Sequence, residues 1–191
     1  MIFQKKEICE IKKVLNFSRM FFVLFSVIVV FSSCIHNVKP DPEILEVKSI
    51  PPLKAINTEV VIINDQQKVK EDHLFFSAGA HSWTGNLHQY TDKAIAVLKD
   101  ALQKRNIKVK PDAEKKLKLS ILKAETDCHF ILKYESNLIM KVETGNGIAV
   151  EIKAHQNTTS QWEITWANEQ AIRYAVIDIL KNDKIIGYLK E

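Results

Sequence analysis

The sequence lacks an uncharged apolar run long enough to cross a membrane. Its prominent apolar run extends from Met20 to Phe31, and as a helix it would be roughly 18 Å long at ~1.5 Å per residue. The hydrocarbon core of a bilayer requires about 30 Å, or ~20 residues. A spanning helix is therefore not the expected structure of this run.

The sequence also lacks the short motifs that carry common chemistry. It has no Gly-x-Ser-x-Gly, P-loop, Gly-x-Gly-x-x-Gly, His-Glu-x-x-His or paired Cys-x-x-Cys. Six histidines are present, and a metal pair of His81 and His88 is a minor alternative to exposed loop histidines. We expect no catalytic residue, no metal and no cofactor, hence a non-enzymatic protein; a hydrolase with an unrecognised site is the least favoured alternative.

The residues around the apolar run are typical of a secretory signal peptide. Five basic residues precede it against two acidic ones, and small residues follow it. A basic region, a short apolar stretch and small residues form such a peptide, and the basic residues hold its start on the cytoplasmic side.

Phe31-Ser32-Ser33-Cys34 resembles the lipobox of bacterial lipoproteins, although Leu is commoner where Phe31 stands. The resemblance implies that residues 1–33 are a lipoprotein signal peptide, cut before Cys34, and that acyl chains are attached to Cys34. Ile35, rather than Asp, follows the cysteine, which implies anchoring in the outer membrane, facing the periplasm. The alternative is an uncleaved signal-anchor helix with an unrelated cysteine.

Removal of residues 1–33 changes both the charge and the cysteine content. The remaining chain has 22 Lys and Arg against 21 Asp and Glu, a net charge of +1. Basicity therefore gives no reason to expect nucleic-acid binding. Cys128 is then the one unmodified thiol, so an internal disulfide is excluded. It alternates with Phe130 and Leu132, which predicts a buried position.

Four of the five prolines lie between residues 35 and 55. Proline removes backbone donors and favours extended geometry. We therefore expect residues 34–56 to be a lipid-anchored tether and residues 57–191 to be one periplasmic domain.

The first half of this domain contains a clear helix. Strands are predicted at 58–64 and 74–80, and a loop at 82–86. Asn86 is positioned to cap a helix over 87–105, and Asn106 to end it. One apolar stripe supports this helix; its members are Tyr90, Ala94, Val97, Leu98 and Ala101.

The second half reads as an antiparallel meander followed by a helix. Alternation predicts a strand at 116–122, one long strand at 128–142 and a return strand from residue 148. Gly145-Asn146-Gly147 is a hairpin signal. A second helix starts between 161 and 167 and ends near Asn182. The predicted fold class is α+β: a two-layer sandwich of a mainly antiparallel sheet with two helices on one face.

The order of these elements is similar to that of small LptE- or YajG-like envelope lipoproteins. The likeness rests on residues 91–122 and on the ending AIRYAVIDILKNDKIIGYL. It implies a role such as envelope assembly, and no functional residue is transferred because no diagnostic motif is shared.

Three tryptophans are the candidate binding residues. Trp83 lies in the predicted loop, where a large apolar side chain often marks a contact site. Trp162 and Trp166 fall on one helix face and either pack over the sheet or form an exposed aromatic patch. We expect a lipid-anchored, partner-binding or scaffold domain; the alternative is a module that binds a small apolar or lipidic ligand between sheet and helices.

Overall fold

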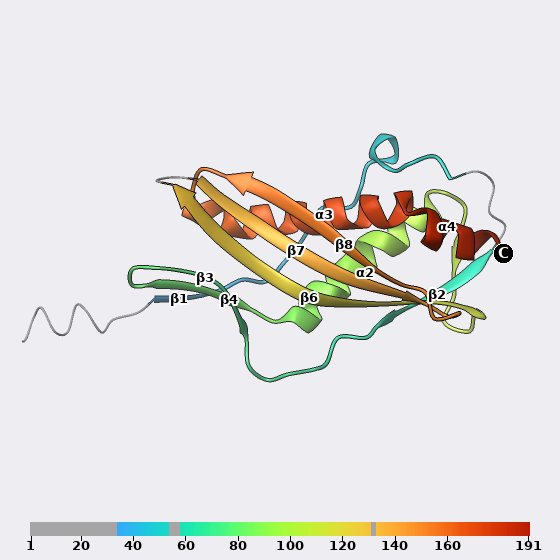
Figure 1. Ribbon diagram of the computed structural model, residues 1–191, viewed down its shortest axis with the longest axis horizontal. Coiled ribbons are helices and arrows are strands. Elements are labelled where there is room, and N and C mark those ends of the chain that lie inside the picture. Colours follow the sequence, from blue (N-terminus) through green and yellow to red (C-terminus); the bar gives the residue numbers. More distant parts are fainter. Residues whose placement is uncertain (1–33, 54–57, 131–132) are drawn as a thin grey trace, which may run out of the picture. The chain divides into compact units, whose positions relative to one another are not determined.

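The computed structural model of the chain describes residues 34–53, 58–130 and 133–191 (Figure 1). The expected signal peptide lies outside the described residues. The described residues divide into a small unit, residues 34–36 and 77–82, and a larger unit, residues 37–53, 58–76, 83–130 and 133–191. The elements in chain order are β1 (Cys34–Asn37), η1 (Val47–Ser49), β2 (Glu59–Asn64), β3 (His73–Ala78), β4 (His81–Gly85), α2 (Leu87–Gln103), β5 (Lys108–Val109), β6 (Lys115–Phe130), β7 (Lys133–Thr144), β8 (Ala149–Thr158), η2 (Gln161–Glu163), α3 (Ile164–Lys181) and α4 (Asp183–Lys190).

The larger unit is built on a five-stranded sheet with the order β5-β2-β6-β7-β8. The pairs β6–β7 and β7–β8 are antiparallel, as the meander pattern predicts. The pairs β2–β5 and β2–β6 are parallel, so the sheet is mixed. A parallel pair needs a long crossover connection, and α2 supplies it between β2 and β6.

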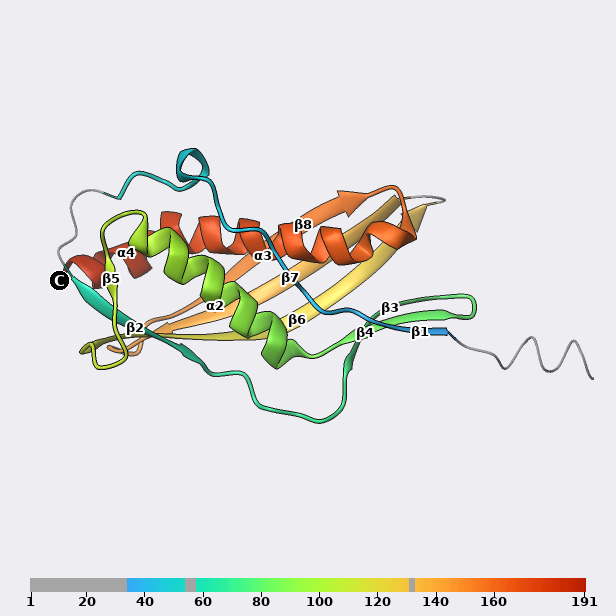
Figure 2. The ribbon, with the colours of Figure 1, turned by 180° about the vertical axis from the view of Figure 1, so that it is seen from behind.

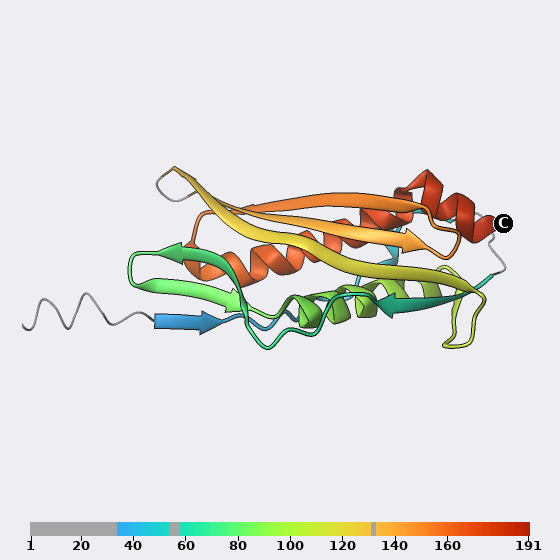
Figure 3. The ribbon, with the colours of Figure 1, turned by 60° about the horizontal axis from the view of Figure 1, so that its bottom comes forward.

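Helices α2 and α3 cover the same face of this sheet, which confirms the predicted α+β fold class. Figure 2 shows both helices in front of the strands, and in Figure 3 α3 runs along the long strands β7 and β8. The core between the two layers is apolar. Its fully or almost fully buried side chains include Leu117, Leu119, Met140, Val142, Ala94, Leu98, Ala171, Ile172, Ala175 and Val176.

Local sequence explains the limits of α2. The side chain of Asn86 accepts hydrogen bonds from the backbone N–H groups of His88 and Gln89, as a capping residue does. Asn106 has a φ of 63°, the left-handed conformation that ends many helices. Both predictions at this helix are confirmed.

The hairpin between β7 and β8 is also confirmed. Gly147 has a φ of 88°, its N–H donates to Thr144 O at 3.0 Å, and Thr144 N–H donates to Ile148 O at 2.9 Å. This is a three-residue loop with a glycine in the left-handed region.

The single long strand predicted at 128–142 is wrong, because β6 ends at Phe130 and a separate, antiparallel strand, β7, begins at Lys133. The register of β6 on β7 shifts between Ile121 and Lys123. Before this bulge the buried residues of β6 have odd numbers, and after it they have even numbers, as the buried residues of β7 do. The alternation of apolar residues therefore does not reveal where β6 ends and β7 begins. Cys128, expected to be buried, is exposed.

Residues 82–86, predicted as a loop, belong largely to β4. This strand lies between β1 and β3 in a separate three-stranded sheet. The C-terminal residues 183–190, to which the sequence pattern assigned no element, form α4, capped by Asn182.

The segment expected to be a tether packs on the larger unit from residue 38 to residue 50. Val38, Leu45 and Ile50 are buried. Figure 2 shows this segment, in blue, crossing the helical layer. We name residues 38–50 the strap. The apolar residues that hold this segment are not spaced with the period of a helix or a strand. The sequence pattern therefore could not predict that the segment packs on the domain.

Candidate functional site

Cys34, the predicted lipidation site, is the first residue of β1 and is exposed. Its N–H donates to Ala80 O at 2.7 Å within the small unit. The thiol of Cys34 is therefore accessible to a modifying enzyme, which acylation requires.

Two histidines of the small unit contact each other. Nε2 of His36 lies 2.9 Å from Nδ1 of His81, and the rings stack with centroids 5.2 Å apart. His88, the other member of the metal pair considered above, lies instead in α2, with Nδ1 2.8 Å from Gln66 O. Among the residues that the structure describes, no group of three or more His, Cys, Asp or Glu side chains is placed to hold a metal ion.

The three candidate tryptophans divide into one buried and two exposed side chains. Trp83, in β4, is only 3% exposed, so its expected loop position is wrong. Trp162, in η2, is 62% exposed and Trp166, in α3, is 46% exposed. The pair therefore does not pack in the core. It lies at the surface, which the spacing of the sequence alone left open.

A series of aromatic rings connects this surface to the core of the larger unit. Trp162 meets Trp83 edge to face with 5.9 Å between ring centroids, and Trp83 contacts Phe76 at 5.4 Å. Phe76 in turn contacts the buried Tyr134 at 5.5 Å. Such tilted pairs stabilise by ~0.5–1.5 kcal/mol each beyond the area they bury. Trp83 therefore packs beneath Trp162 and supports it. We name the two exposed side chains, Trp162 and Trp166, the tryptophan patch.

The turn from β8 into η2 holds the backbone at Trp162 in place. Ser160 Oγ accepts a hydrogen bond from Trp162 N–H at 3.3 Å. The hydroxyl of Thr158, at the end of β8, donates to the carboxylate of Glu163. Both bonds fix the turn from β8 into η2, the segment that carries Trp162.

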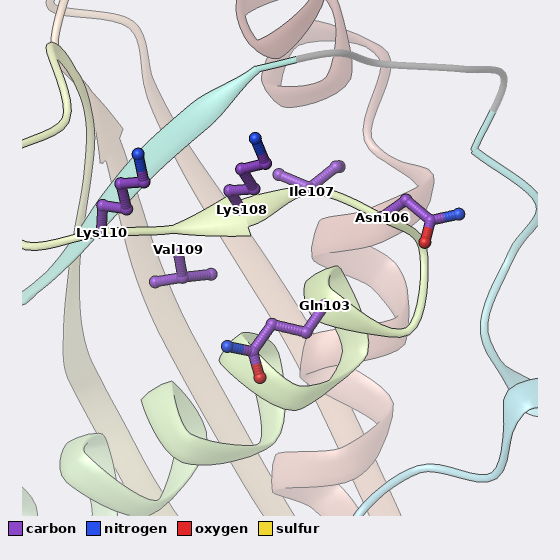
Figure 4. A pocket seen from close by; sticks show the side chains of 6 residues that line it. All are labelled: Gln103, Asn106, Ile107, Lys108, Val109 and Lys110. Atoms are coloured by element: carbon purple, nitrogen blue, oxygen red, sulfur yellow. The ribbon is translucent and has the colours of Figure 1, made fainter.

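A hollow of about 480 Å³ lies where α2 passes into β5 (Figure 4). Figure 4 shows Val109 pointing toward Gln103, whereas Lys108 and Lys110 lie on the other side of β5. Lys110 Nζ is 2.6 Å from Glu59 Oε1, and this contact raises the pKa of Lys110. Lys108 Nζ lies 3.9 Å from the same oxygen, so both lysines at this hollow are engaged in surface ion pairs, which have small energies.

A second hollow, of about 510 Å³, lies between β8 and α3. Lys153, Ala154 and His155 border it from the strand, with Ser49 of the strap. Four residues border it from the helix; they are Tyr174, Ile177, Asp178 and Lys181. We name this hollow the β8–α3 groove. Its lining combines apolar side chains with charged ones.

The strap is held to the helices by polar contacts as well as by its buried side chains. Lys93 Nζ of α2 lies 2.7 Å from Asp41 Oδ1, and this hydrogen bond lowers the pKa of Asp41. Asp41 N–H donates to Glu169 Oε1 of α3 at 2.8 Å, and Lys104 Nζ donates to Leu45 O at 2.8 Å. The strap therefore bridges α2 and α3.

No protein-family model matches the sequence, and no curated protein matches it. The fold is similar to that of protein XCC0632 from Xanthomonas campestris, described as a DUF330 protein. The TM-score is 0.57 at 11% identity, over 81% of this chain and 96% of that chain. This likeness shows the fold alone.

Two weaker likenesses have TM-scores below 0.5. The hypothetical protein CT253 from Chlamydia trachomatis is 12% identical over 70% of this chain and 98% of its own, with a TM-score of 0.43. PelC from Paraburkholderia phytofirmans, solved as a dodecamer, is 10% identical over 74% of this chain and 92% of its own, with a TM-score of 0.36. Neither carries an argument about this chain.

None of the helices in the described part of the chain is both long enough and apolar enough to cross a bilayer.

Proposed function

We propose that this chain is a lipoprotein of the cell envelope, anchored by acyl chains on Cys34, whose folded domain binds a partner protein and has no enzymatic activity. The observation that carries the proposal is the order basic region, short apolar run, Ser32-Ser33-Cys34. The exposure of Cys34 supports it, and so does the resemblance of the element order to LptE- or YajG-like lipoproteins. Ile35 after the cysteine favours the outer membrane, on the side facing the periplasm.

Such a protein acts by holding its folded domain at one face of a membrane. Each methylene of an acyl chain buried in the bilayer contributes ~0.8 kcal/mol, so two or three chains anchor far more firmly than one. A domain confined to one membrane face meets its neighbours there at a high effective concentration. Weak contacts are then sufficient for a specific complex.

The tryptophan patch is the surface that we assign to the partner. Trp162 and Trp166 expose large apolar areas, and Trp is enriched among the residues that dominate the energy of protein interfaces. A lipid surface is the other occupant that the same side chains suit, because Trp is enriched at membrane interfaces. The hollows described above are bordered by charged groups, so they add no support to the alternative of a small apolar ligand.

Mass spectrometry of the mature N-terminus tests the anchor. The wild-type chain is expected to begin at Cys34 and to carry the mass of its acyl chains, whereas Cys34→Ala remains unacylated. Retention of Met1 in the wild type, or an unmodified Cys34 thiol, contradicts the proposal.

Cross-linking in intact cells tests the tryptophan patch. We expect Trp162→Ala combined with Trp166→Ala to lose a stoichiometric envelope cross-link that the wild type forms. Leu122→Ala, which truncates an exposed side chain on β6, is the matched control and retains the cross-link. Equal cross-linking in both variants would assign the partner to another surface.

A further inference from the structure

The two edges of the five-stranded sheet differ in how they are protected from a further strand. One edge, β5, is only two residues long and is followed by Lys110 and Pro111. Short edge strands, lysine and proline are devices by which proteins block unwanted strand pairing. The other edge, β8, is ten residues long, contains no proline, and pairs with β7 without a register shift. The β8 edge is therefore neither short nor interrupted by proline, and Lys153 is its one lysine.

The hydrogen bonds of the hairpin show which groups of β8 face outward. Thr144 N–H donates to Ile148 O, so these residues form a hydrogen-bonded pair. Such pairs alternate along an antiparallel ladder, and the register runs unbroken from Glu143 opposite Ala149 to Tyr134 opposite Thr158. The backbone groups of residues 150, 152 and 154 thus face β7, and those of residues 149, 151, 153 and 155 point away from the sheet.

These outward groups are available for pairing. Within residues 34–53, 58–130 and 133–191, no hydrogen bond joins the backbone of residue 151, 153 or 155 to a group beyond β8. Further along, the carbonyl of Asn157 accepts from Gln156 Nε2 at 2.8 Å. The open stretch therefore covers residues 149–155, enough for a segment of about seven residues.

The β8–α3 groove lies beside this open stretch and indicates what such a segment carries. Tyr174 and Ile177 offer apolar area from α3, and Tyr174 is exposed. Lys153 and Lys181 also line the groove, with one acid, Asp178, whose Oδ1 lies 3.8 Å from Lys181 Nζ. The excess of positive charge in this lining favours an acidic residue in the occupant, and its apolar side chains favour an apolar one.

We propose that β8 binds an extended segment of a partner protein as an added strand, with an apolar side chain in the β8–α3 groove and an acidic residue beside Lys153. Added strands obtain affinity from main-chain hydrogen bonds and specificity from pockets for alternate side chains. The proposal goes beyond the partner-binding role assigned to the tryptophan patch, because it adds a second surface, the β8 edge, and names the form and charge of the segment bound there. A second copy of this chain is the competing occupant.

A library of random twelve-residue peptides displayed on phage is the probe, selected against the full chain purified in detergent. The selected peptides are expected to combine acidic and apolar residues. On binding, amide hydrogen exchange at Glu151, Lys153 and His155 is expected to slow at least tenfold. Protection confined to other amides, or failure to select any binding peptide, overturns the proposal.

Two substitutions at one position separate the backbone from the side chain. Lys153→Pro removes an outward N–H and leaves the ladder with β7 intact, because proline is tolerated on edge strands. We expect it to weaken peptide binding at least tenfold. Lys153→Ala keeps the N–H and is expected to weaken binding no more than threefold to fivefold. Equal losses in the two variants contradict strand addition.

A second pair of variants keeps the test decisive if Lys153→Pro does not fold. Glu151→Pro removes the neighbouring outward N–H and is expected to cause a similar loss, while Glu151→Ala removes only an acid and retains binding. Sedimentation then tests the competing occupant: a dimer that Lys153→Pro dissociates assigns the edge to a second copy and overturns the proposal.

Mass spectrometry and peptide binding, measured on the same wild-type protein, separate this inference from the proposed anchor. If the wild-type chain is unacylated but binds the selected peptides, the anchor is refuted and the strand-addition site is retained. An acylated Cys34 in a chain that binds no peptide refutes the strand-addition site alone.

Discussion

At the scale of single residues, Gly85 is a position where one added carbon has a defined cost. A Cβ at this residue would lie 2.6 Å from the backbone oxygen of Val38 and 2.6 Å from Cε2 of Phe75. The backbone atom belongs to the strap and cannot rotate away. We expect Gly85→Ala to lower the free energy of unfolding by about 1–3 kcal/mol, the usual range for overpacking, measured by urea denaturation.

Gly187 is the matched control for this substitution. It lies in α4, and nothing lies within 4 Å of the Cβ that alanine would add. Glycine inside a helix costs ~0.5–1 kcal/mol relative to alanine, so Gly187→Ala is expected to raise the urea midpoint. A lowered midpoint for Gly187→Ala, or an unchanged one for Gly85→Ala, would contradict this geometry.

The buried phenol of Tyr90 predicts a loss of stability in alkali. The side chain is 1% exposed, and its hydroxyl has no hydrogen-bond partner within the described part of the chain. Burial, with a smaller effect of the Glu169 carboxylate, raises the pKa of Tyr90. Because the folded state favours the protonated form, its contribution is complete below the unfolded value of about 10 and is lost as the pH rises above it.

Tyr90→Phe removes both the unpaired hydroxyl and this titration. We expect the variant to be about as stable as the wild type at neutral pH and to lose less stability between about pH 9 and 11, measured by urea denaturation across that range. Tyr174→Phe, at an exposed position, is the control and is expected to follow the wild type. Identical alkaline profiles for wild type and Tyr90→Phe would exclude Tyr90 as the cause.

At the scale of elements, the strap is the segment whose structure differs most from the expectation of a free tether. Leu45 is 1% exposed, whereas the adjacent Ile44 is 58% exposed. Removing a buried leucine side chain costs ~2–5 kcal/mol, while exposed substitutions usually change stability by less than ~0.5 kcal/mol. We expect Leu45→Ala to lower the melting temperature of the larger unit strongly and Ile44→Ala to leave it unchanged, as measured by calorimetry. Equal melting temperatures for the two variants would mean that residues 38–50 are a free tether and do not pack on the helices.

The elements that the sequence predicted correctly are those whose signals are local. β2, α2 and the 145–147 hairpin each follow from a period, a cap or a glycine within about twenty residues. The boundary between β6 and β7 was missed because, after the bulge near Leu122, the buried residues of both strands have even numbers. The strap and the parallel pairing of β2 with β6 depend on contacts between distant segments, which periodicity does not record.

The candidate site was predictable only in part for the same reason. The identity of the three tryptophans could be read from the sequence, but their burial could not. Trp83 was expected on a loop and is buried in β4, whereas Trp162 and Trp166 lie at the surface. The groove beside β8 was missed because it joins a strand to a helix and a strap residue far apart in the chain. An edge strand becomes recognisable only once the order of the whole sheet is known.

At the scale of the whole molecule, the proposed anchor and the folded domain are expected to act independently. The core of the larger unit is made by its own residues from 38 to 189. We therefore expect Cys34→Ala to move the protein from the membrane fraction to the soluble fraction while its unfolding midpoint changes by less than about 2 °C, the lower end of the shift that a 1 kcal/mol loss causes in a domain of this size. A large drop in the midpoint would mean that acylation supports the fold.

The charge of the mature chain makes a further prediction about how the protein is attached. From Cys34 to the C-terminus the chain carries 22 basic and 21 acidic residues, so attraction to anionic lipids is weak. Ionic attraction at a surface falls as the Debye length shrinks from ~10 Å at 0.1 M salt to ~3 Å at 1 M, whereas burial of hydrocarbon does not. Washing membranes with 1 M NaCl is therefore expected to release less than about a tenth of the wild-type protein, and detergent is expected to release nearly all of it, because acyl chains, unlike charges, are not screened by salt. Release by salt alone, measured by immunoblotting of the two fractions, would show that charge or a protein partner, and not acylated Cys34, holds the domain at the membrane.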